Sequence, residues 1–157
     1  MELVACDIGG TNARFAIARI EADGAIALDQ PVTLSTSDFS SLGAAWEAFE
    51  REHDGPVPRA AAIAIAGPVT GDAVRMTNNR WIIRPAALEA QLGLDRALVL
   101  NDFAAVAHAA ACLPQSDFVH LSGPELPLPE TGTISVIGPG TGLGVALFHR
   151  FGGGYHV

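Results

Sequence analysis

The chain has 157 residues, of which 49% are hydrophobic and 17% charged, enough for one ordinary domain, or for one domain and part of another. Its net charge is -8 and all of its nine basic residues are arginine, so no basic cluster offers a surface for nucleic acid or an anionic membrane. Without lysine there is no P-loop lysine and no Schiff base, so phosphate binding would have to use backbone N–H groups, arginine and metal.

The cysteines and histidines form no metal-site pattern. Cys6 and Cys112 are far apart and neither lies in a C-x-x-C pair, while the five histidines are scattered. A reduced chain without structural zinc follows from this. The N-terminus, Met1-Glu2-Leu3, has no positively charged region, and the longest apolar runs are far shorter than a membrane span. We therefore expect a cytoplasmic protein that binds neither nucleic acid nor membrane.

The N-terminal segment predicts a hairpin with a glycine turn. An apolar run at 3–6 stops at Asp7-Ile8-Gly9-Gly10-Thr11-Asn12, and an alternating segment at 13–19 follows. The two glycines let an anion approach the backbone, Thr11 and Asn12 can add hydrogen bonds, and Asp7 can hold a hydrated Mg2+. A plain hairpin turn explains the same residues.

Further strands and a helix are expected next. A third strand is predicted at 25–34, and Ser37 or Asp38 is predicted to cap a helix whose apolar positions continue to Phe49 at helical spacing. The segment 60–66 is apolar throughout, as a central strand covered on both faces should be.

A polar loop follows at 69–83. Its asparagines, including Asn78, lie near Trp81, a composition suited to a pocket for a polar ligand. An ordinary loop rich in asparagine is the alternative. Pro85 then opens a helix that Gly93 ends.

The strand predicted at 97–100 leads directly into Asn101-Asp102. The Asp102 carboxylate should therefore lie at the carboxyl end of a buried strand, where open α/β sheets bind their ligands. The alternative is that Asp102 only caps the following helix. That helix, at 103–112, is almost wholly apolar, so we expect it to be buried, with His108 as a core histidine.

A second glycine hairpin is predicted near the end of the chain. After a Pro-rich, acidic connection at 115–132, a strand at 133–137 runs into Gly138-Pro139-Gly140-Thr141-Gly142-Leu143-Gly144, and a strand at 145–148 follows. The dinucleotide fingerprint fails because position 143 is Leu, and a Walker A loop fails for want of lysine. Two glycine hairpins on either side of a strand-end Asp favour a phosphate held between two domains.

Five segments resemble, in the same order, the signatures of bacterial glucokinases, within the superfamily of sugar kinases, Hsp70 and actin. They are Asp7 to Arg14, Ala66 to Val69, Met76 to Trp81, Leu100 to Phe103 and Gly138 to Gly144. The resemblance implies an RNase H-like α/β sheet with flanking helices at 1–112, followed at 113–157 by the start of a second α/β domain. It also implies that two domains close on a cleft.

The resemblance implies ATP and Mg2+ as cosubstrates and phosphorylation of glucose on its 6-hydroxyl. Asp102 would be the general base in contact with the sugar, Asn101 would hold sugar hydroxyls, and Asn78 would be a further sugar-side residue. Residues expected at the ATP phosphates are Asp7, which also serves the metal, Gly9, Gly10 and Thr11 in the first turn, and Gly140, Thr141 and Gly142 in the second. Family members continue for about as long again, so this chain is expected to carry the N-terminal part of the site.

Two other functions of the superfamily stay as alternatives. A sugar-responsive regulator would need a DNA-binding helix or a basic face, and neither is seen in the sequence. An actin-like ATPase would use the strand-end Asp for hydrolysis, but Asn101 beside Asp102 favours a polyhydroxylated substrate. The preferred sugar, the choice of ATP or polyphosphate as donor, and the formation of a homo-oligomer are left open.

Overall fold

The computed structural model describes residues 1–76, 79–139 and 143–157. Their contacts divide the chain into two compact units, Met1–Asp102 and Phe103–Val157. The division falls at the start of a helix, whereas the sequence-based boundary lay at its end, after residue 112. Each unit is described by itself below.

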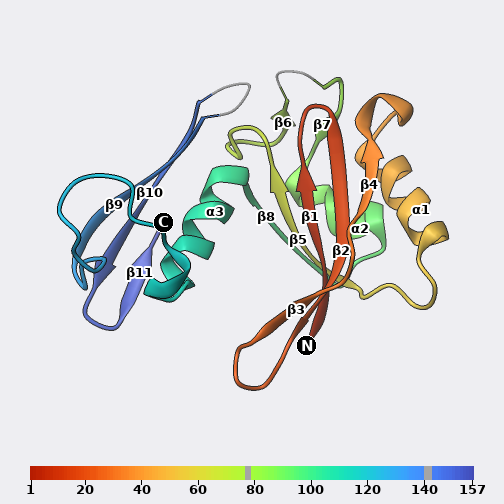
Figure 1. Ribbon diagram of the computed structural model, residues 1–157. Coiled ribbons are helices and arrows are strands. Elements are labelled where there is room, and N and C mark those ends of the chain that lie inside the picture. The colour runs from red at the N-terminus through yellow and green to blue at the C-terminus, as the bar shows by residue number, and fades with distance from the viewer. Residues whose placement is uncertain (77–78, 140–142) are drawn as a thin grey trace. The chain divides into compact units, whose positions relative to one another are not determined.

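The first unit holds the larger sheet (Figure 1). Its elements are, in chain order, β1 (Glu2–Ile8), β2 (Asn12–Ile20), β3 (Ile26–Leu28), β4 (Val32–Ser35), the 3-10 turn η1 (Thr36–Asp38), α1 (Leu42–Glu52), β5 (Ala60–Ile65), β6 (Val74–Arg75), β7 (Ile82–Ile83), the 3-10 turn η2 (Pro85–Ala87), α2 (Leu88–Leu92) and β8 (Arg96–Asn101). The second unit contains α3 (Asp102–Cys112, whose first residue belongs to the first unit), the 3-10 turn η3 (Gln115–Asp117), β9 (Gly132–Pro139), β10 (Leu143–Phe151) and β11 (Gly154–His156).

Strand β1 organises the first sheet. It pairs antiparallel with β2 and parallel with β5, and β5 pairs parallel with β8. The order is β3-β2-β1-β5-β8, with β4 paired to β2 as well. An antiparallel meander continued by parallel strands, with helices between them, is the expected RNase H-like α/β sheet.

One face of this sheet carries the hydrophobic core. Side chains alternate along a strand, so Val4, Cys6 and Ile8 of β1 point to one face, and all three are buried. Helix α1 packs aromatic rings on this face. The ring of Phe15 lies 5.2 Å from that of Phe49, and all of these side chains belong to one buried cluster that includes residues of α2.

The opposite face carries mainly alanine. Ala5 of β1 lies beside Ala16 of β2 and Ala62 of β5. Burial along β5 alternates between buried and half-buried residues, so the expectation that segment 60–66 is covered on both faces is wrong. The periodicity was hidden because the less covered face of β5 carries only alanine and the buried face carries Ala61 and two isoleucines, and both residue types count as apolar.

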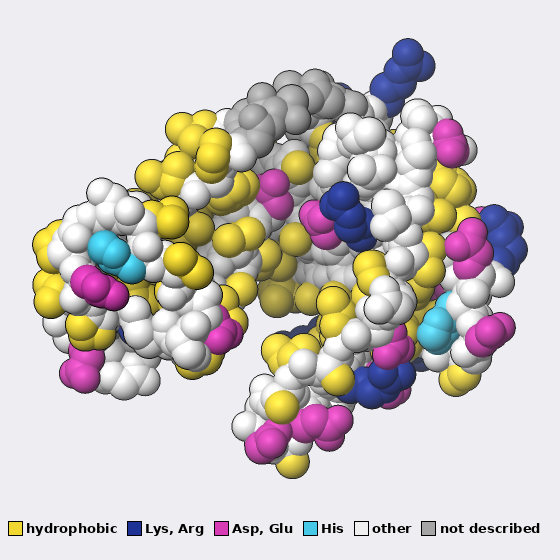
Figure 2. All heavy atoms as spheres, viewed as in Figure 1, with side chains coloured by type: hydrophobic (Ala, Val, Ile, Leu, Met, Phe, Trp, Pro, Cys, Tyr) yellow, Lys and Arg dark blue, Asp and Glu magenta, His cyan; other side chains and the backbone are white. Residues whose placement is uncertain are grey.

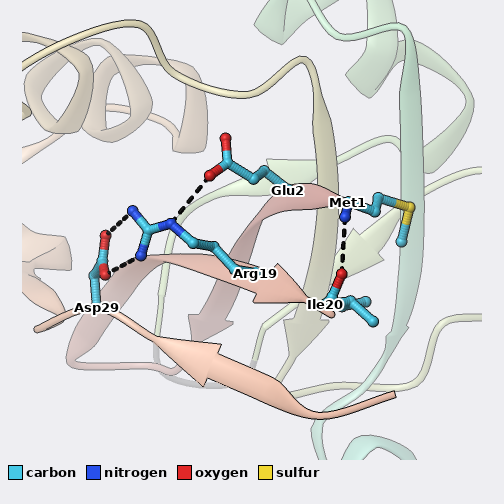
Figure 3. Close-up of polar contacts among 5 residues, drawn as sticks. All are labelled: Met1, Glu2, Arg19, Ile20 and Asp29. Carbon is cyan, nitrogen blue, oxygen red and sulfur yellow. Dashed lines mark hydrogen bonds and ion pairs between the residues drawn. The ribbon is translucent and has the colours of Figure 1, made fainter. Parts of the chain in front are cut away.

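The strand predicted at 25–34 is two strands, β3 and β4. Between them Asp29 forms a two-pronged ion pair with Arg19 of β2, and Arg19 also reaches Glu2 at 3.0 Å (Figure 3). Pro31 follows, which has no N–H to donate to a ladder. The hydrogen bond from Arg19 lowers the pKa of the Asp29 carboxyl.

The helix caps are partly as expected. Ser37 and Asp38 lie in η1, and the side chain that caps α1 is Ser41, whose hydroxyl accepts a hydrogen bond from the Ala44 N–H at 3.2 Å. The prediction that Ser37 or Asp38 caps this helix is therefore wrong. The end of α2 at Gly93 is confirmed, because this glycine has the left-handed conformation that favours glycine, with φ of 65°.

The second unit is a three-stranded antiparallel sheet, ordered β11-β10-β9, with α3 beside it. The predicted hairpin is confirmed, but burial of its helix is not, since Ala107 is the one fully buried residue of α3. His108 is exposed and lies within 3.2 Å of the Tyr155 hydroxyl, so the core-histidine expectation is wrong. Alanine makes a helix apolar without making it large enough to require full burial.

Hydrophobic side chains lie at the surface of this unit. Ile137 on β9, and Leu143, Val145 and Leu147 on β10, are each more than half exposed, and Figure 2 shows hydrophobic atoms gathered over this hairpin. In the described parts of the chain, no helix is long and apolar enough to cross a membrane.

Candidate active site

Three of the five sequence motifs meet at one end of the first sheet. Because β1, β5 and β8 run parallel, their carboxyl ends lie at the same edge. The register places Ile8 beside Ile65 and Ile65 beside Asn101, so the three strands end at one level. The residues just beyond that level are the first glycine turn, the Ala66-Gly67-Pro68 segment and Asp102. This edge is the candidate active site of the first unit.

The first glycine turn is held by hydrogen bonds from outside the hairpin. Gly9 N–H donates to the Asn12 carbonyl at 2.9 Å and closes the turn. Thr36 donates through its hydroxyl to the Gly10 carbonyl at 2.8 Å and through its backbone N–H to the Thr11 carbonyl at 2.9 Å. Two carbonyl oxygens are thereby occupied within the protein.

Thr36 is a functional support that the sequence did not indicate. It is the buried polar residue among the described ones, with 5% of its surface exposed. Its partners lie 25 or more positions earlier in the chain, and the η1 segment that carries it had been assigned to a helix start. A turn whose carbonyls are fixed in this way keeps its backbone in one conformation, which a phosphate cradle requires.

Asp7 stands at the end of β1, on the alanine face, opposite Arg14 of β2. The Arg14 guanidinium donates to the Asp7 carboxylate at 2.8 Å, and both side chains are about half exposed. Arg14 was part of the recognised motif but had no assigned role. The hairpin register alone would have paired these two residues, since a four-residue turn places them directly across from one another.

The donor set at this edge fits a Mg2+ ion held mainly by a nucleotide. The described residues contain no cluster of three or more His, Cys, Asp or Glu side chains. Mg2+ is commonly held by one or two carboxylates together with phosphate oxygens and water, so a single half-exposed carboxylate such as Asp7 is sufficient. Arg14 would then change partner or share it.

The Asn101 side chain holds Asp102. Its amide nitrogen donates to the Gly67 carbonyl at 3.0 Å and to the Asp102 carboxylate at 2.8 Å. Both partners are acceptors, so the amide group can face them only with its nitrogen, and both of its hydrogens are used. The Asn101 amide therefore connects the carboxylate of Asp102 to the segment that follows β5.

Asp102 is both the first residue of α3 and the end of a strand. It is half-buried, and as the first helical residue it lies where the partial positive charge of a helix N-terminus favours a carboxylate. The N-cap position of α3 is therefore Asn101, and the alternative that Asp102 caps a helix starting at Phe103 is wrong. Through Asn101, the Asp102 carboxylate is also linked to Gly67, which belongs to another motif. Stabilising the start of a helix does not require such a link.

In the polar loop at 69–83, Trp81 does not have the position beside a ligand pocket that one of the two interpretations gave it. Trp81 is buried in the core, and its indole N–H donates to the Phe39 carbonyl at 2.9 Å, so it does not line a pocket. Asn79 accepts from the Trp81 N–H, while its amide nitrogen is buried without a partner among the described residues. Asn78 lies outside the described residues.

The second glycine turn is described only at its flanks. Gly140, Thr141 and Gly142 lie outside the described residues, whereas Gly138 and Gly144 lie opposite each other as a cross-strand pair. The phosphate role of this turn stays a prediction.

Comparison with known proteins agrees with these features. A family model described as glucokinase matches residues 4–157. Glucokinase of Zymomonas mobilis subsp. mobilis is 48% identical over the whole chain, and glucokinase of Saccharophagus degradans is 40% identical over 91% of it. The chain spans about half the length of these curated relatives, 48% and 44% respectively.

Solved structures show the same fold. A glucokinase from an Antarctic psychrotroph superposes with a TM-score of 0.79 at 31% identity, covering 99% of this chain and 48% of that one. The glucokinase of Balamuthia mandrillaris, solved with glucose, gives 0.71 at 24% identity over 99% of this chain and 46% of its own. With the family model matching nearly every residue, the chain belongs to the glucokinase family.

Proposed function

We propose that this chain supplies the N-terminal part of a cytoplasmic glucokinase, which transfers a phosphoryl group from ATP to the 6-hydroxyl of glucose. The observation that carries the proposal is the position of Asp102. It stands at the carboxyl edge of the parallel strands, level with the first glycine turn, and Asn101 holds its carboxylate. A carboxylate fixed beside an anion-binding turn is what a hydroxyl nucleophile and a phosphate donor need.

In this proposal Asp102 accepts the proton of the 6-hydroxyl as the oxygen attacks phosphorus. Phosphoryl transfer passes through a loose transition state, so the protein acts mainly by positioning groups and stabilising charge. Asn101 holds the carboxylate through its bonds to Gly67 and Asp102, and the family resemblance gives Asn101 a further contact with sugar hydroxyls. Asn78 would add a further sugar contact.

The donor side would be held by the glycine turns. The backbone at Gly9, Gly10 and Thr11, supported by Thr36, would receive the phosphates together with Gly140, Thr141 and Gly142. Mg2+, when bound near Asp7, would neutralise charge on the phosphates. Arg14 supplies a positive charge beside the same carboxylate, which is one way to bind phosphate in a chain without lysine.

Asp102→Asn tests the base in a polypeptide of the relatives' length that carries these residues. The substitution keeps size and hydrogen-bonding reach but removes the proton acceptor, so kcat should fall by about two to four powers of ten with glucose affinity little changed. Steady-state assay of glucose 6-phosphate formation and calorimetric titration of glucose measure the two quantities.

Asp54→Asn is the matched control, since Asp54 is an exposed loop residue of the same unit. It should leave kcat unchanged. If Asp102 only stabilised the start of α3 through its charge, catalysis would persist in Asp102→Asn, with a stability loss of about 1 kcal/mol or less. Near wild-type kcat in Asp102→Asn would therefore remove the base. Glucose-independent ATP hydrolysis at the same rate would instead favour an actin-like ATPase.

A further inference from the structure

The glycines on either side of the second turn lie directly opposite each other. In the register of β9 and β10, Gly138 pairs with Gly144. Both are half-buried and share the sheet face that carries Phe148. Neither has a positive φ, so the backbone conformation itself does not require glycine at either position.

The aromatic ring of Phe103 accounts for both glycines. A Cβ atom added at Gly138 would lie 2.5 Å from Cζ and 2.8 Å from Cε1 of Phe103, and one added at Gly144 would overlap the same ring. Carbon atoms in contact lie about 3.5 to 4.0 Å apart, so no side chain fits at either position while the ring stays. Gly138 and Gly144, hereafter the glycine pair, form a flat surface on which the ring rests.

The ring joins two parts of the chain that are distant in sequence. Phe103 is the second residue of α3 and follows Asp102 directly. Between the glycine pair and residues 140–142 there is one further cross-strand pair, Pro139 with Leu143. The family resemblance assigns residues 140–142 to the ATP phosphates. The contact therefore connects the end of the β9–β10 hairpin that lies next to residues 140–142 with the first turn of α3, the helix that Asp102 begins.

We propose that Phe103 is a positioning residue for phosphoryl transfer, because its ring on the glycine pair fixes the phosphate-side end of the β9–β10 hairpin. This inference rests on the proposed kinase function. Phe103 touches neither sugar nor phosphate in this scheme and acts through the hairpin backbone. The glycine-rich motif then has two purposes: its outer glycines admit the ring, and its inner residues serve the nucleotide.

The packing half of the proposal is tested with Gly144→Ala, Phe103→Ala and the double variant in the chain itself. Hydrogen exchange of peptides from β9 and β10, read by mass spectrometry, reports on this hairpin alone. Gly144→Ala should speed exchange by about tenfold or more, since overpacking destabilises a well-packed contact. Adding Phe103→Ala should slow it again. Gly152→Ala is the control, because nothing lies within 4 Å of its Cβ position and its φ is not positive.

Gly144→Ala behaving like Gly152→Ala would overturn the packing assignment. So would a double variant that exchanges as fast as, or faster than, Gly144→Ala alone, because the ring would then not be the obstacle.

The positioning half is tested by kinetics in the polypeptide of the relatives' length. Phe103→Ala should raise the KM for ATP by about tenfold to a hundredfold, the effect of displacing a positioned group by about 1 Å, while the KM for glucose changes by less than about twofold. A variant that is less stable but keeps its KM for ATP would refute positioning and leave the proposed function standing. A wild-type protein without any kinase activity would refute the proposed function, and the positioning role with it.

Discussion

The chain builds two hairpins of similar sequence in very different surroundings. In both, an apolar strand runs into a glycine turn and an apolar strand returns. On β2, Phe15 and Ile17 are almost wholly buried, whereas on β10 Val145 and Leu147 are each 53% exposed. The first hairpin lies under α1, but α3 lies along only one face of the second. Apolar alternation therefore indicates that a strand forms, and elements far along the chain decide which of its faces are covered.

The largest expected difference between the two units is the response to losing an aromatic side chain. Phe49→Ala removes a buried ring that packs on Phe15, and we expect the free energy of unfolding of the first unit to fall by about 3 to 5 kcal/mol. Both tryptophans, Trp46 and Trp81, belong to this unit, so urea titration followed by tryptophan fluorescence reports on it selectively. Phe151→Ala in the second unit is the control, since that ring is half exposed, and hydrogen exchange of β9 and β10 peptides measures its loss of stability. Equal losses for the two variants would contradict the comparison.

The two cysteines allow a second test of the difference between the units, through the pH dependence of the free energy of unfolding. Each unit contains one cysteine. Burial raises the pKa of the Cys6 thiol, whereas Cys112 is exposed. The thiol ionises in the unfolded chain near pH 8.5 and stays neutral in the folded one, so its stability contribution is complete below that pH and is lost as pH rises. Above it, the free energy of unfolding should fall by about 1.4 kcal/mol per pH unit.

Cys6→Ala provides the control for this pH dependence. The measurement is the slope of stability against pH from 8 to 10, by tryptophan fluorescence, in wild type and variant. No lysine titrates in this window, which leaves few other groups to confuse it. Identical slopes in the two proteins would show that Cys6 is not buried as a neutral thiol.

The smallest expected change in stability is at the exposed face of the second hairpin. Leu147→Thr should alter the free energy of unfolding by less than about 0.5 kcal/mol, because this side chain is already in water. Exposed apolar strands promote association, so the variant should instead sediment more fully as a monomer. Ile17→Thr, on the second strand of the first hairpin, is the matched control and should unfold its unit. Wild-type protein that is a compact monomer at all concentrations would contradict the association.

Sequence patterns predicted the longer strands and the first glycine turn well, and the helices less well. Strands β1, β2, β5, β8, β9 and β10 were found because apolar runs stop at Gly, Asp or Asn. The cap of α1 was misplaced because several candidate residues, Ser37, Asp38, Ser40 and Ser41, precede one apolar stripe. Burial of α3 was overestimated because an alanine-rich helix is hydrophobic in composition but offers little side-chain surface to bury.

The site was predictable where its residues are adjacent in sequence. Asn101 and Asp102 were singled out together, and the structure links them by a hydrogen bond. Thr36 and Phe103 were missed because each acts on a glycine turn some 25 or more residues away, and no local pattern marks such a contact. Gly138 and Gly144 were identified, but for a turn rather than for the ring that rests on them.

The common level at which β1, β5 and β8 end limits how this gene can change in length. One residue inserted into β5 would move Gly67 by about 3.3 Å along the strand and exchange the isoleucines and alanines between the two faces. The Asn101 side-chain amide would then lose its hydrogen bond to the Gly67 carbonyl. Insertions at the exposed residues around Gly55, which connect α1 to β5, leave that alignment intact. Among members of this family, length variation should therefore collect in such connections and be absent from the three parallel strands.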